Sequence, residues 1–286
     1  MRLKTARQIP VSAKTLEPIL ERAAEVIANA DALLITAGAG MGVDSGLPDF
    51  RGPEGFWKAY PAIAKLGLSF SQMANPTWFE TDPALAWAFY GHRLNLYRRT
   101  VPHAGFQLLL QAATRKPKGY FVFTSNVDGH FQKAGFAAER IVECHGSIHH
   151  LQCAQNCTNA IWDAAGTEVT LDENIFRATG RLPRCKHCGE LARPNILMFG
   201  DPIWQSDRSN EQHEKLDAWI RGLDAPLAIV EIGAGSAIPT VRYTSERMAT
   251  LTRGTLIRIN PREPEVPAGH LGIPLNAGEG LRRIFK

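Results

Sequence analysis

Short, mainly apolar runs, each followed by glycine or by small polar residues, recur along this chain. Unbroken runs of this length are typical of strands buried on both faces of a parallel sheet. The runs cover residues 31–35, 119–124, 140–144, 226–232 and 255–260. Apolar residues at helical spacing lie beside several of them, over 15–30, 106–113, 211–222 and 275–286. The pattern predicts an α/β fold with a parallel sheet.

Residues 53–100 interrupt this pattern. Helix-like pieces alternate there with prolines at 61, 76 and 83, no strand stands out, and aromatic residues are frequent. We therefore predict a small helical insertion whose aromatic side chains form its core. The insertion contains Tyr90-Gly91-His92-Arg93, which could equally be an exposed helix face.

The composition sets limits on the class of protein. The 286 residues can form one large domain with an insertion. A net charge of +4 fits an anionic cofactor and does not by itself imply nucleic acid. No apolar run reaches the ~18 residues that a membrane span needs. The opening segment, 1–15, is basic and free of acids, as in a transit peptide, although we expect a flexible arm.

Gly38-Ala39-Gly40 directly follows the first predicted strand. Glycines at this place let main-chain N–H groups approach a pyrophosphate, so the first candidate ligand is a dinucleotide. The dehydrogenase pattern G-x-G-x-x-G is absent because Val43 replaces its third glycine, and no acidic residue ends a strand about 20 residues later. A tight strand-to-helix turn without a ligand is the alternative.

Two further strands end in side chains that carry chemistry. Ser125-Asn126-Val127-Asp128 follows the second strand, and His145 follows the third. Polar groups just past the carboxyl ends of parallel strands lie where open α/β sheets bind ligands. Both have structural alternatives, since Ser-Asn and Asp-Gly favour turns and a lone histidine is more often structural than catalytic.

Four of the five cysteines form two close pairs, Cys153 with Cys157 and Cys185 with Cys188. In an enzyme-sized intracellular chain such pairs indicate metal ligands rather than disulfides, which points to the cytosol. We predict one structural zinc ion on the four thiolates, with no open position for water. His187 is a competing ligand, and a nucleic-acid-binding zinc ribbon is an alternative that the weakly basic surroundings do not favour.

The string GAGMGVDSGLPDFRG, over 38–52, resembles the first motif of the sirtuins, the NAD-dependent protein-lysine deacylases. Three later strings, TSNVD over 124–128, ECHGS over 143–147 and RPNILMFGD over 193–201, resemble further sirtuin motifs in the same order. The chain departs from the usual sirtuin residues at Gly42, Ser125, Cys144, Ala234 and Gly235. These departures indicate a divergent branch of the family.

The resemblance implies a Rossmann-like, doubly wound parallel sheet with a smaller lobe. It assigns the NAD-binding domain to 16–52, 97–149 and 195–286. The smaller lobe would consist of a helical insertion over 53–96 and a zinc-binding insertion over 150–194, and residues 1–15 would form an N-terminal arm. NAD and an extended acyl-lysine peptide would lie between the two lobes.

The activity implied is NAD-dependent removal of acyl groups from protein lysine side chains, which yields nicotinamide and O-acyl-ADP-ribose. His145 would take a proton from a ribose hydroxyl, with Asn126 and Asp128 beside the nicotinamide ribose. Phe50 would screen the reactive ribose from water. The predicted cofactor-binding residues are Gly38, Ala39, Gly40, Asp49, Phe50, Arg51, Ser125, Asn126, Val127, Asp128, Gly233, Ala234, Gly235, Asn260 and Ala277.

The same resemblance implies how a substrate is held. Met198, Phe199 and Gly200 would pair with the acyl-lysine peptide. Tyr90 and Arg93 resemble the motif of sirtuins that remove succinyl or malonyl groups, because arginine binds a carboxylate bidentately. Protein ADP-ribosyl transfer, NAD hydrolysis and non-catalytic binding of NAD or an acyl-peptide are the rival hypotheses. We expect a cytoplasmic monomer or weak oligomer without a membrane or nucleic-acid partner.

Overall fold

The computed structural model of the chain describes residues 13–48 and 52–286. These residues form a main sheet of six parallel strands in the order β11-β10-β9-β1-β2-β3. The strands are β1 (Ala32–Ala37), β2 (Tyr120–Thr124), β3 (Ile141–Glu143), β9 (Leu227–Ile232), β10 (Thr255–Ile259) and β11 (Leu271–Ile273). The chain winds outward in one direction from β1 and in the other from β9, so the strand order reverses between these two neighbours. The predicted doubly wound parallel sheet is confirmed.

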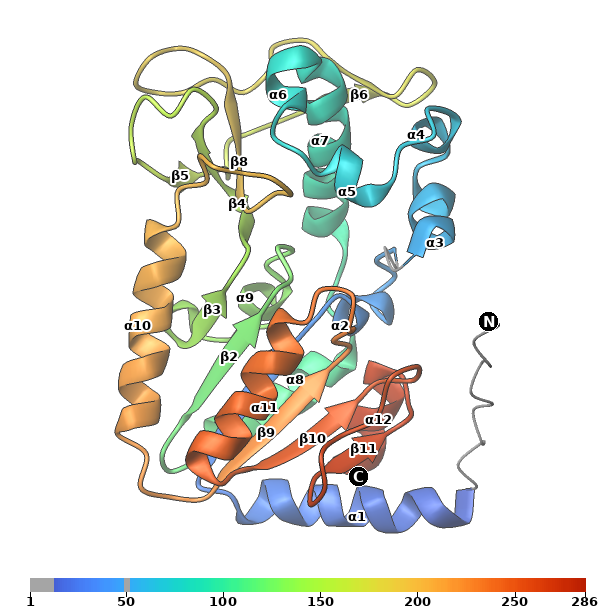
Figure 1. The fold of residues 1–286 in the computed structure, drawn as a ribbon, viewed down its shortest axis with the longest axis vertical. Coiled ribbons are helices and arrows are strands. Elements are labelled where there is room, and N and C mark those ends of the chain that lie inside the picture. The colour runs from blue at the N-terminus through green and yellow to red at the C-terminus, as the bar shows by residue number, and fades with distance from the viewer. Residues whose placement is uncertain (1–12, 49–51) are drawn as a thin grey trace, which may run out of the picture.

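Helices cover both faces of this sheet (Figure 1). The first face carries α1 (Ala13–Asn29), α8 (Ala104–Thr114) and α12 (Ala277–Ile284), and the second carries α10 (Asp207–Arg221) and α11 (Thr240–Thr252). Alternate residues of β1 serve the two faces, with Leu33 and Ile35 toward the first and Leu34 toward the second. Every residue of β1, β2 and β9 is buried, which explains why these strands are mainly apolar. The buried charge of Glu231 in β9 is paired with Arg258.

The remaining elements form a smaller lobe, which lies above the main sheet in Figure 1. Its helices are α3 (Gly52–Ala59), α4 (Pro61–Lys65), α5 (Phe70–Met73), α6 (Trp78–Thr81) and α7 (Pro83–Arg99). One antiparallel sheet contains β4 (Gly146–Cys153), β5 (Trp162–Asp163) and β8 (Ala192–Ile196), and a separate hairpin contains β6 (Thr170–Asp172) and β7 (Arg177–Thr179). Short turns in the loops of the main sheet are α2 (Gly40–Val43), α9 (His130–Lys133) and η1 (Ala138–Arg140).

Helix α7 joins the helical insertion to the cysteine-bearing insertion. The indole Nε1 of Trp87 donates to the carbonyl of Ala192, at the start of β8, at 3.0 Å. Gly91 lets Val169 approach so closely that a Cβ at position 91 would lie 2.4 Å from the Val169 side chain. At the end of the helix, Arg98 donates to carbonyls in the loop that follows β5. The aromatic core predicted for 53–100 surrounds this helix.

Several elements differ from the sequence predictions in place or extent. Strand β11 and the short strands β5, β6 and β7 were not predicted. Helix α10 begins at Asp207, whereas the apolar spacing predicted a start at residue 211. Strand β8 runs across the predicted domain boundary between residues 194 and 195, so the division into domains stays a prediction.

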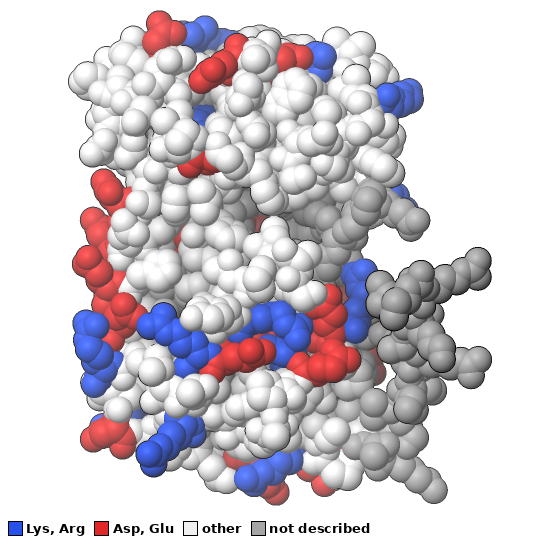
Figure 2. Space-filling view, viewed as in Figure 1, with Lys and Arg blue, Asp and Glu red and all other residues white. Residues whose placement is uncertain are grey.

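The surface drawn in Figure 2 carries acidic and basic side chains side by side in one band across the lower half, over the main sheet. The region directly above this band is mostly uncharged. Within the described ranges, no helix combines the length and the apolar sequence that crossing a membrane requires.

Candidate active site

The loops that follow β1 and β9 are in direct contact where the strand order reverses. Gly40 donates its N–H to the Gly233 carbonyl at 3.0 Å. A Cβ on Gly38 would lie 2.8 Å from the Cα of Ala234, and one on Gly233 would lie 2.5 Å from the Cα of Gly40. Gly233 also has a φ of +63°, which L side chains rarely adopt. Glycine is therefore required at both positions, and the two loops form one continuous main-chain surface.

This surface has the donors that a pyrophosphate needs. The N–H groups of Ala39, Ala234 and Gly235 donate to no acceptor among the residues that the structure describes. Main-chain N–H groups without acceptors, next to glycines, favour the binding of anions. Asn260 shapes the same surface, because its Nδ2 donates to the Ala234 carbonyl at 2.7 Å. The residues at this edge therefore fit NAD.

Asn126 ties the loop after β2 to the loop after β1. Its Nδ2 donates to the Gly38 carbonyl at 3.0 Å, and its own N–H donates to Thr124 Oγ1 at 3.0 Å. Asp128 is buried, and its Oδ1 accepts the N–H of His130 at 2.9 Å. Asn126 thus fixes the loop itself, and it brings the segment carrying Asp128 to the edge where the glycine loops meet.

His145 lies between β3 and β4, and its imidazole lies close to the backbone of Ser125. Burial lowers the pKa of His145 below its ordinary value, and the nearby backbone of Ser125 opposes part of this shift. A neutral imidazole has one ring nitrogen that can accept a proton. A neutral imidazole with an open acceptor nitrogen is what a general base requires. The structure thus brings His145, Asn126 and Gly38 together.

A buried ion pair holds the segment that follows β8. Arg193 binds Asp201 through both guanidinium NH₂ groups, with Nη1 at 3.1 Å from Oδ1, and both side chains are buried. The N–H of Met198 donates to the same carboxylate at 3.3 Å. Leu197 donates its N–H to the His145 carbonyl at 2.9 Å, which places this segment beside the candidate base.

The Phe199 side chain links this segment to α7. The ring centroids of Phe70 and Phe199 are 6.1 Å apart, and the guanidinium carbon of Arg93 lies 5.9 Å from the Phe70 centroid. Arg93 is buried, and its Nε donates to the hydroxyl of Tyr97 at 3.0 Å. The buried hydroxyl of Tyr90 has no hydrogen-bond partner in the described part of the chain. A cation and an unused hydroxyl thus adjoin the predicted peptide site.

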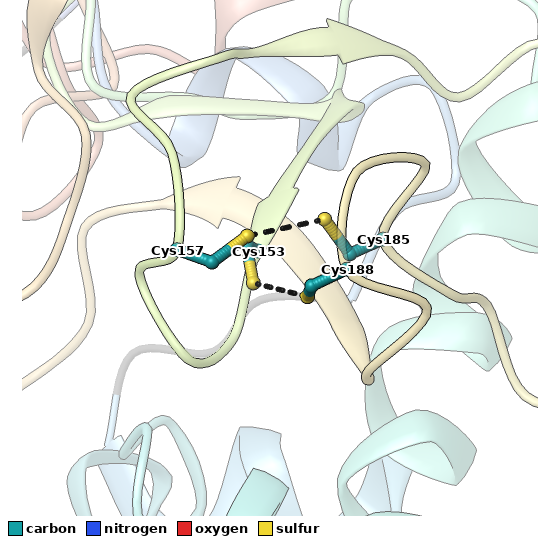
Figure 3. Close-up of side chains that lie close together, drawn as sticks. All are labelled: Cys153, Cys157, Cys185 and Cys188. Atoms are coloured by element: carbon teal, nitrogen blue, oxygen red, sulfur yellow. Dashed lines mark hydrogen bonds between the residues drawn. The ribbon is translucent and has the colours of Figure 1, made fainter.

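The four predicted zinc ligands come together in the smaller lobe (Figure 3). Their sulfur atoms all lie within 4.8 Å of one another, and Cys153–Cys188 and Cys157–Cys185 are each 3.7 Å apart. Zinc–sulfur bonds of about 2.3 Å in a tetrahedron give sulfur–sulfur distances of about 3.8 Å, so the thiolates fit zinc. His187 Nδ1 lies 3.7 Å from Cys157, but four thiolates leave it no coordination position.

A comparison with known proteins assigns the chain to a family. Residues 38–221 match the model of the Sir2 family. The chain belongs to the Sir2 family. An NAD-dependent protein deacylase of Pyrococcus abyssi is 27% identical over 265 residues, which cover 91% of this chain and 94% of that protein. An NAD-dependent protein deacylase of Thermococcus kodakarensis is 32% identical over 187 residues, which cover 65% of this chain and 66% of that protein.

Solved Sir2 structures share the fold. A Sir2 homologue in complex with NAD superposes with a TM-score of 0.66 at 23% identity, over 93% of this chain and 92% of that one. A mutant Sir2 homologue in complex with ADP-ribose gives a TM-score of 0.68 at 24% identity, over 93% and 94%. The predicted family membership and fold class are confirmed.

Gly42, where Sir2 proteins of the sirtuin type usually have serine, has a local explanation in this member. A Cβ at this position would lie 2.9 Å from Cδ1 of Leu47 and 3.6 Å from Oδ2 of Asp128. The Leu47 side chain therefore fills the space that a serine side chain would need. A serine here would have to displace Leu47.

Two residues of this Sir2 site were missed by the sequence analysis. His149 donates from Nε2 to the Asp128 carbonyl at 2.9 Å, and its ring covers Gly129. The available hint was Gly129 itself, whose φ of +70° needs glycine beside a large neighbour. Tyr97 binds Arg93 from one helical turn away, a spacing that places both side chains on one face of the helix.

Some predicted residues gain no support from this geometry. Asp49, Phe50 and Arg51 lie outside the described residues, so their role stays a prediction. Val127 is buried in the core of the smaller lobe, which leaves only its main chain for a cofactor. Ala277 is buried at the start of α12, and its contact with the cofactor also stays a prediction.

Proposed function

We propose that this chain is an NAD-dependent protein-lysine deacylase, which converts NAD, an acylated lysine and water into nicotinamide, O-acyl-ADP-ribose and free lysine. One observation carries the proposal: a hydrogen bond joins Asn126 to Gly38 at the edge where the strand order reverses, and His145 lies against the backbone of Ser125, next to Asn126. Open α/β sheets bind their ligands at that edge. The relatives described as NAD-dependent protein deacylases give further support.

Groups of this chain would prepare each part of the reaction. NAD, when bound, supplies a ribose carbon from which nicotinamide can leave under attack by the acyl oxygen. The free N–H groups at the glycine loops would hold the pyrophosphate. The buried carboxylate of Asp128 would favour the positive charge that develops on the ribose. His145, whose pKa burial keeps below its ordinary value, would take a proton from a ribose hydroxyl through its unprotonated ring nitrogen.

An extended peptide would lie along the segment after β8. Leu197 and Phe199 are 39% and 41% exposed, so their side chains are accessible to such a peptide. Main-chain pairing with this segment would give affinity with little demand on the peptide sequence. The bond between Leu197 and the His145 carbonyl keeps the peptide next to the base.

We further propose a preference for acidic acyl groups, succinyl or malonyl. The guanidinium of Arg93 lies 5.3–6.0 Å from the ring centroids of Phe70, Phe89, Tyr90 and Tyr97. In so apolar an environment a carboxylate at the end of the acyl chain would bind the cation more strongly than in water. The Tyr90 hydroxyl, which has no partner among the described residues, would add a donor.

Product counting with an acetylated and a succinylated peptide tests the reaction. We expect one O-acyl-ADP-ribose for each nicotinamide released. His145→Ala should lower turnover by about 10²–10⁴-fold, as loss of a general base does. His213→Ala, on the outer helix α10, is the matched control and should keep turnover. If free ADP-ribose or ADP-ribosylated protein is the main product, the activity is NAD hydrolysis or ADP-ribosyl transfer and not deacylation. Full turnover in His145→Ala would show that His145 is not the general base.

The acyl preference is tested with Arg93→Met and, as control on the same helix, the exposed Arg99→Met. Loss of the buried cation should reduce kcat/KM for succinyl-lysine by about 10²-fold or more, since charge-assisted bonds to a carboxylate are lost. Activity on acetyl-lysine should fall much less. An equal loss on both peptides would show that Arg93 acts on the fold and not on the acyl group.

A further inference from the structure

The hydroxyl of Tyr97 fixes the guanidinium of Arg93 among the aromatic side chains around α7. Arg93 Nε donates to this hydroxyl at 3.0 Å, and both side chains are buried. The surrounding ring centroids lie 5.3–6.0 Å from the guanidinium carbon, and attraction to a ring face lets a cation slide across it. The hydrogen bond is directional, so it sets one position for the cation.

Tyr97 is in turn held from the side of the cofactor edge. Its ring packs edge-to-face against the ring of His130, with the two centroids 6.4 Å apart. His130 is buried in α9, and its N–H donates to Asp128 Oδ1 at 2.9 Å. A chain of contacts from Arg93 through Tyr97 and His130 to Asp128 therefore sets the distance between the cation and the loop that carries Asp128.

The Tyr97 hydroxyl holds the cation without contributing a negative charge. Burial raises the pKa of Tyr97 above its ordinary value, so the hydroxyl stays protonated near pH 7. A neutral acceptor fixes the position of the guanidinium and does not compete as an anion with a carboxylate at the end of an acyl chain.

We propose that Tyr97 is a positioning residue through which this enzyme selects acid-ended acyl groups by their length. The acyl carbonyl must lie at the nicotinamide ribose, beside Asp128, while the carboxylate at the other end must reach Arg93. Because the contacts through Tyr97 fix the distance between these two points, one number of methylene groups fits between them. The inference rests on the proposed deacylation and acyl preference, and it adds to them a residue that sets the acyl length.

The length of one methylene group is enough to make this selection measurable. Malonyl, succinyl and glutaryl groups differ by one methylene each, which moves the carboxylate by about 1 Å. A misplacement of this size can cost about 10²-fold in rate when both ends of a substrate are held. Without the Tyr97 hydroxyl, the rotatable bonds of Arg93 would let the guanidinium follow carboxylates at different distances.

Steady-state kinetics with one peptide that carries acetyl-, malonyl-, succinyl- or glutaryl-lysine test the inference. In the wild type, kcat/KM for the best acidic group should exceed that for the next by at least about tenfold. Tyr97→Phe removes only the hydroxyl and should narrow this difference at least about threefold, mainly through KM. Acetyl-lysine, measured with every variant, is the reference that cancels effects on the fold or on cofactor binding.

Tyr120→Phe is the matched control, because the buried Tyr120 hydroxyl also accepts one hydrogen bond, from the N–H of Ala137 at 3.1 Å. This variant should keep the wild-type dependence on acyl length. Tyr97→Met replaces the phenylalanine variant if that one does not fold.

The outcomes separate this inference from the proposals on which it rests. An unchanged length dependence in Tyr97→Phe, or an equal loss on all three acidic groups, overturns the inference and leaves the deacylase and its acyl preference standing. A wild type that treats the three acidic groups alike also overturns it. Activity on acetyl-lysine alone would remove the acyl preference as well, and a wild type that releases no nicotinamide would contradict the deacylase proposal itself.

Discussion

Two regions of this protein are stabilised by different interactions. One is the cofactor edge, where the loops after β1 and β9 meet, and the other is the peptide side, the smaller lobe next to the segment after β8. At the cofactor edge, Gly38 and Gly233 bring main chains into contact, and each follows a strand whose residues are all buried. On the peptide side, the sheets have only three and two strands. Order there comes from four thiolates and the aromatic cluster around α7.

This difference indicates where each region obtains its stability. Parallel strands covered on both faces bury enough apolar surface to be stable without a metal ion. The smaller lobe has sheets of only three and two strands, so single cross-links contribute a larger part of its stability. Loss of one cross-link should therefore unfold the smaller lobe while the main sheet persists, and variants in matched pairs can test this.

The largest effect is expected from the zinc ligands. Cys185→Ser should abolish stoichiometric zinc binding, which contributes about 10–16 kcal/mol in small zinc domains. Mass spectrometry of the metal content and limited proteolysis over 146–196 should show an empty, unfolded zinc insertion, while ADP-ribose still binds the main sheet. Cys144→Ser, outside the cluster, should keep one zinc ion per chain. Zinc retained by Cys185→Ser would contradict the four-thiolate site.

The second largest effect is expected from breaking a buried ion pair, and each region contains one. Arg193 pairs with Asp201 near the peptide site, and Arg258 pairs with Glu231 inside the main sheet. Arg193→Met and Arg258→Met should each cost about 3–5 kcal/mol in urea unfolding, because a carboxylate stays buried without its partner.

The two ion-pair variants should differ in function. Only Arg193→Met should raise the KM for the acyl-peptide, since Asp201 also orients the N–H of Met198. Equal effects of the two variants on this KM would show that the segment after β8 does not bind the peptide.

Alanine variants of two glycines with positive φ should distinguish the effect of backbone strain alone from the effect of strain combined with a steric clash. Gly200 has a φ of +65° with its nearest neighbour 3.8 Å from an added Cβ, so Gly200→Ala should cost only about 1–2 kcal/mol. Gly233→Ala adds a clash with the loop after β1 and should weaken NAD binding by at least about tenfold. Calorimetry and thermal unfolding measure both. Unchanged NAD affinity in Gly233→Ala would mean that the two loops need not touch.

The smallest effect is expected from pH, through a histidine of the smaller lobe. Burial, with the nearby Arg208 cation as the second cause, lowers the pKa of His150 from 6.5 to about 4. The unfolded chain therefore takes up this proton first, so stability is fully present above pH 6.5 and is lost as the pH falls toward 4. The unfolding temperature should drop between pH 7.5 and 5, and His150→Leu should reduce the drop. An identical drop in both proteins would exclude His150 as a cause.

The parts of the fold that were predictable from the sequence are those with local causes. Unbroken apolar runs indicate buried strands, and the cysteine spacing predicted the cluster because the four thiolates belong to two tight turns. Strands such as β5, at Trp162 and Asp163, have no apolar run and exist because β4 and the cysteine cluster fix them. His149 was missed because its place in the site depends on the fold, which brings its ring over Gly129 and its Nε2 to the Asp128 carbonyl.

Helix α7 also has a consequence for the synthesis of this protein. The indole N–H of its Trp87 donates a hydrogen bond to the carbonyl of Ala192, which lies 105 residues further along the chain. At a translation rate of about 5–20 residues per second, the helix waits about 5–20 seconds for that partner to leave the ribosome. During this interval the residues that bury the aromatic side chains of α7 in the folded protein are not yet all synthesised. We therefore expect the nascent chain to depend on chaperones most strongly before residue 192 emerges.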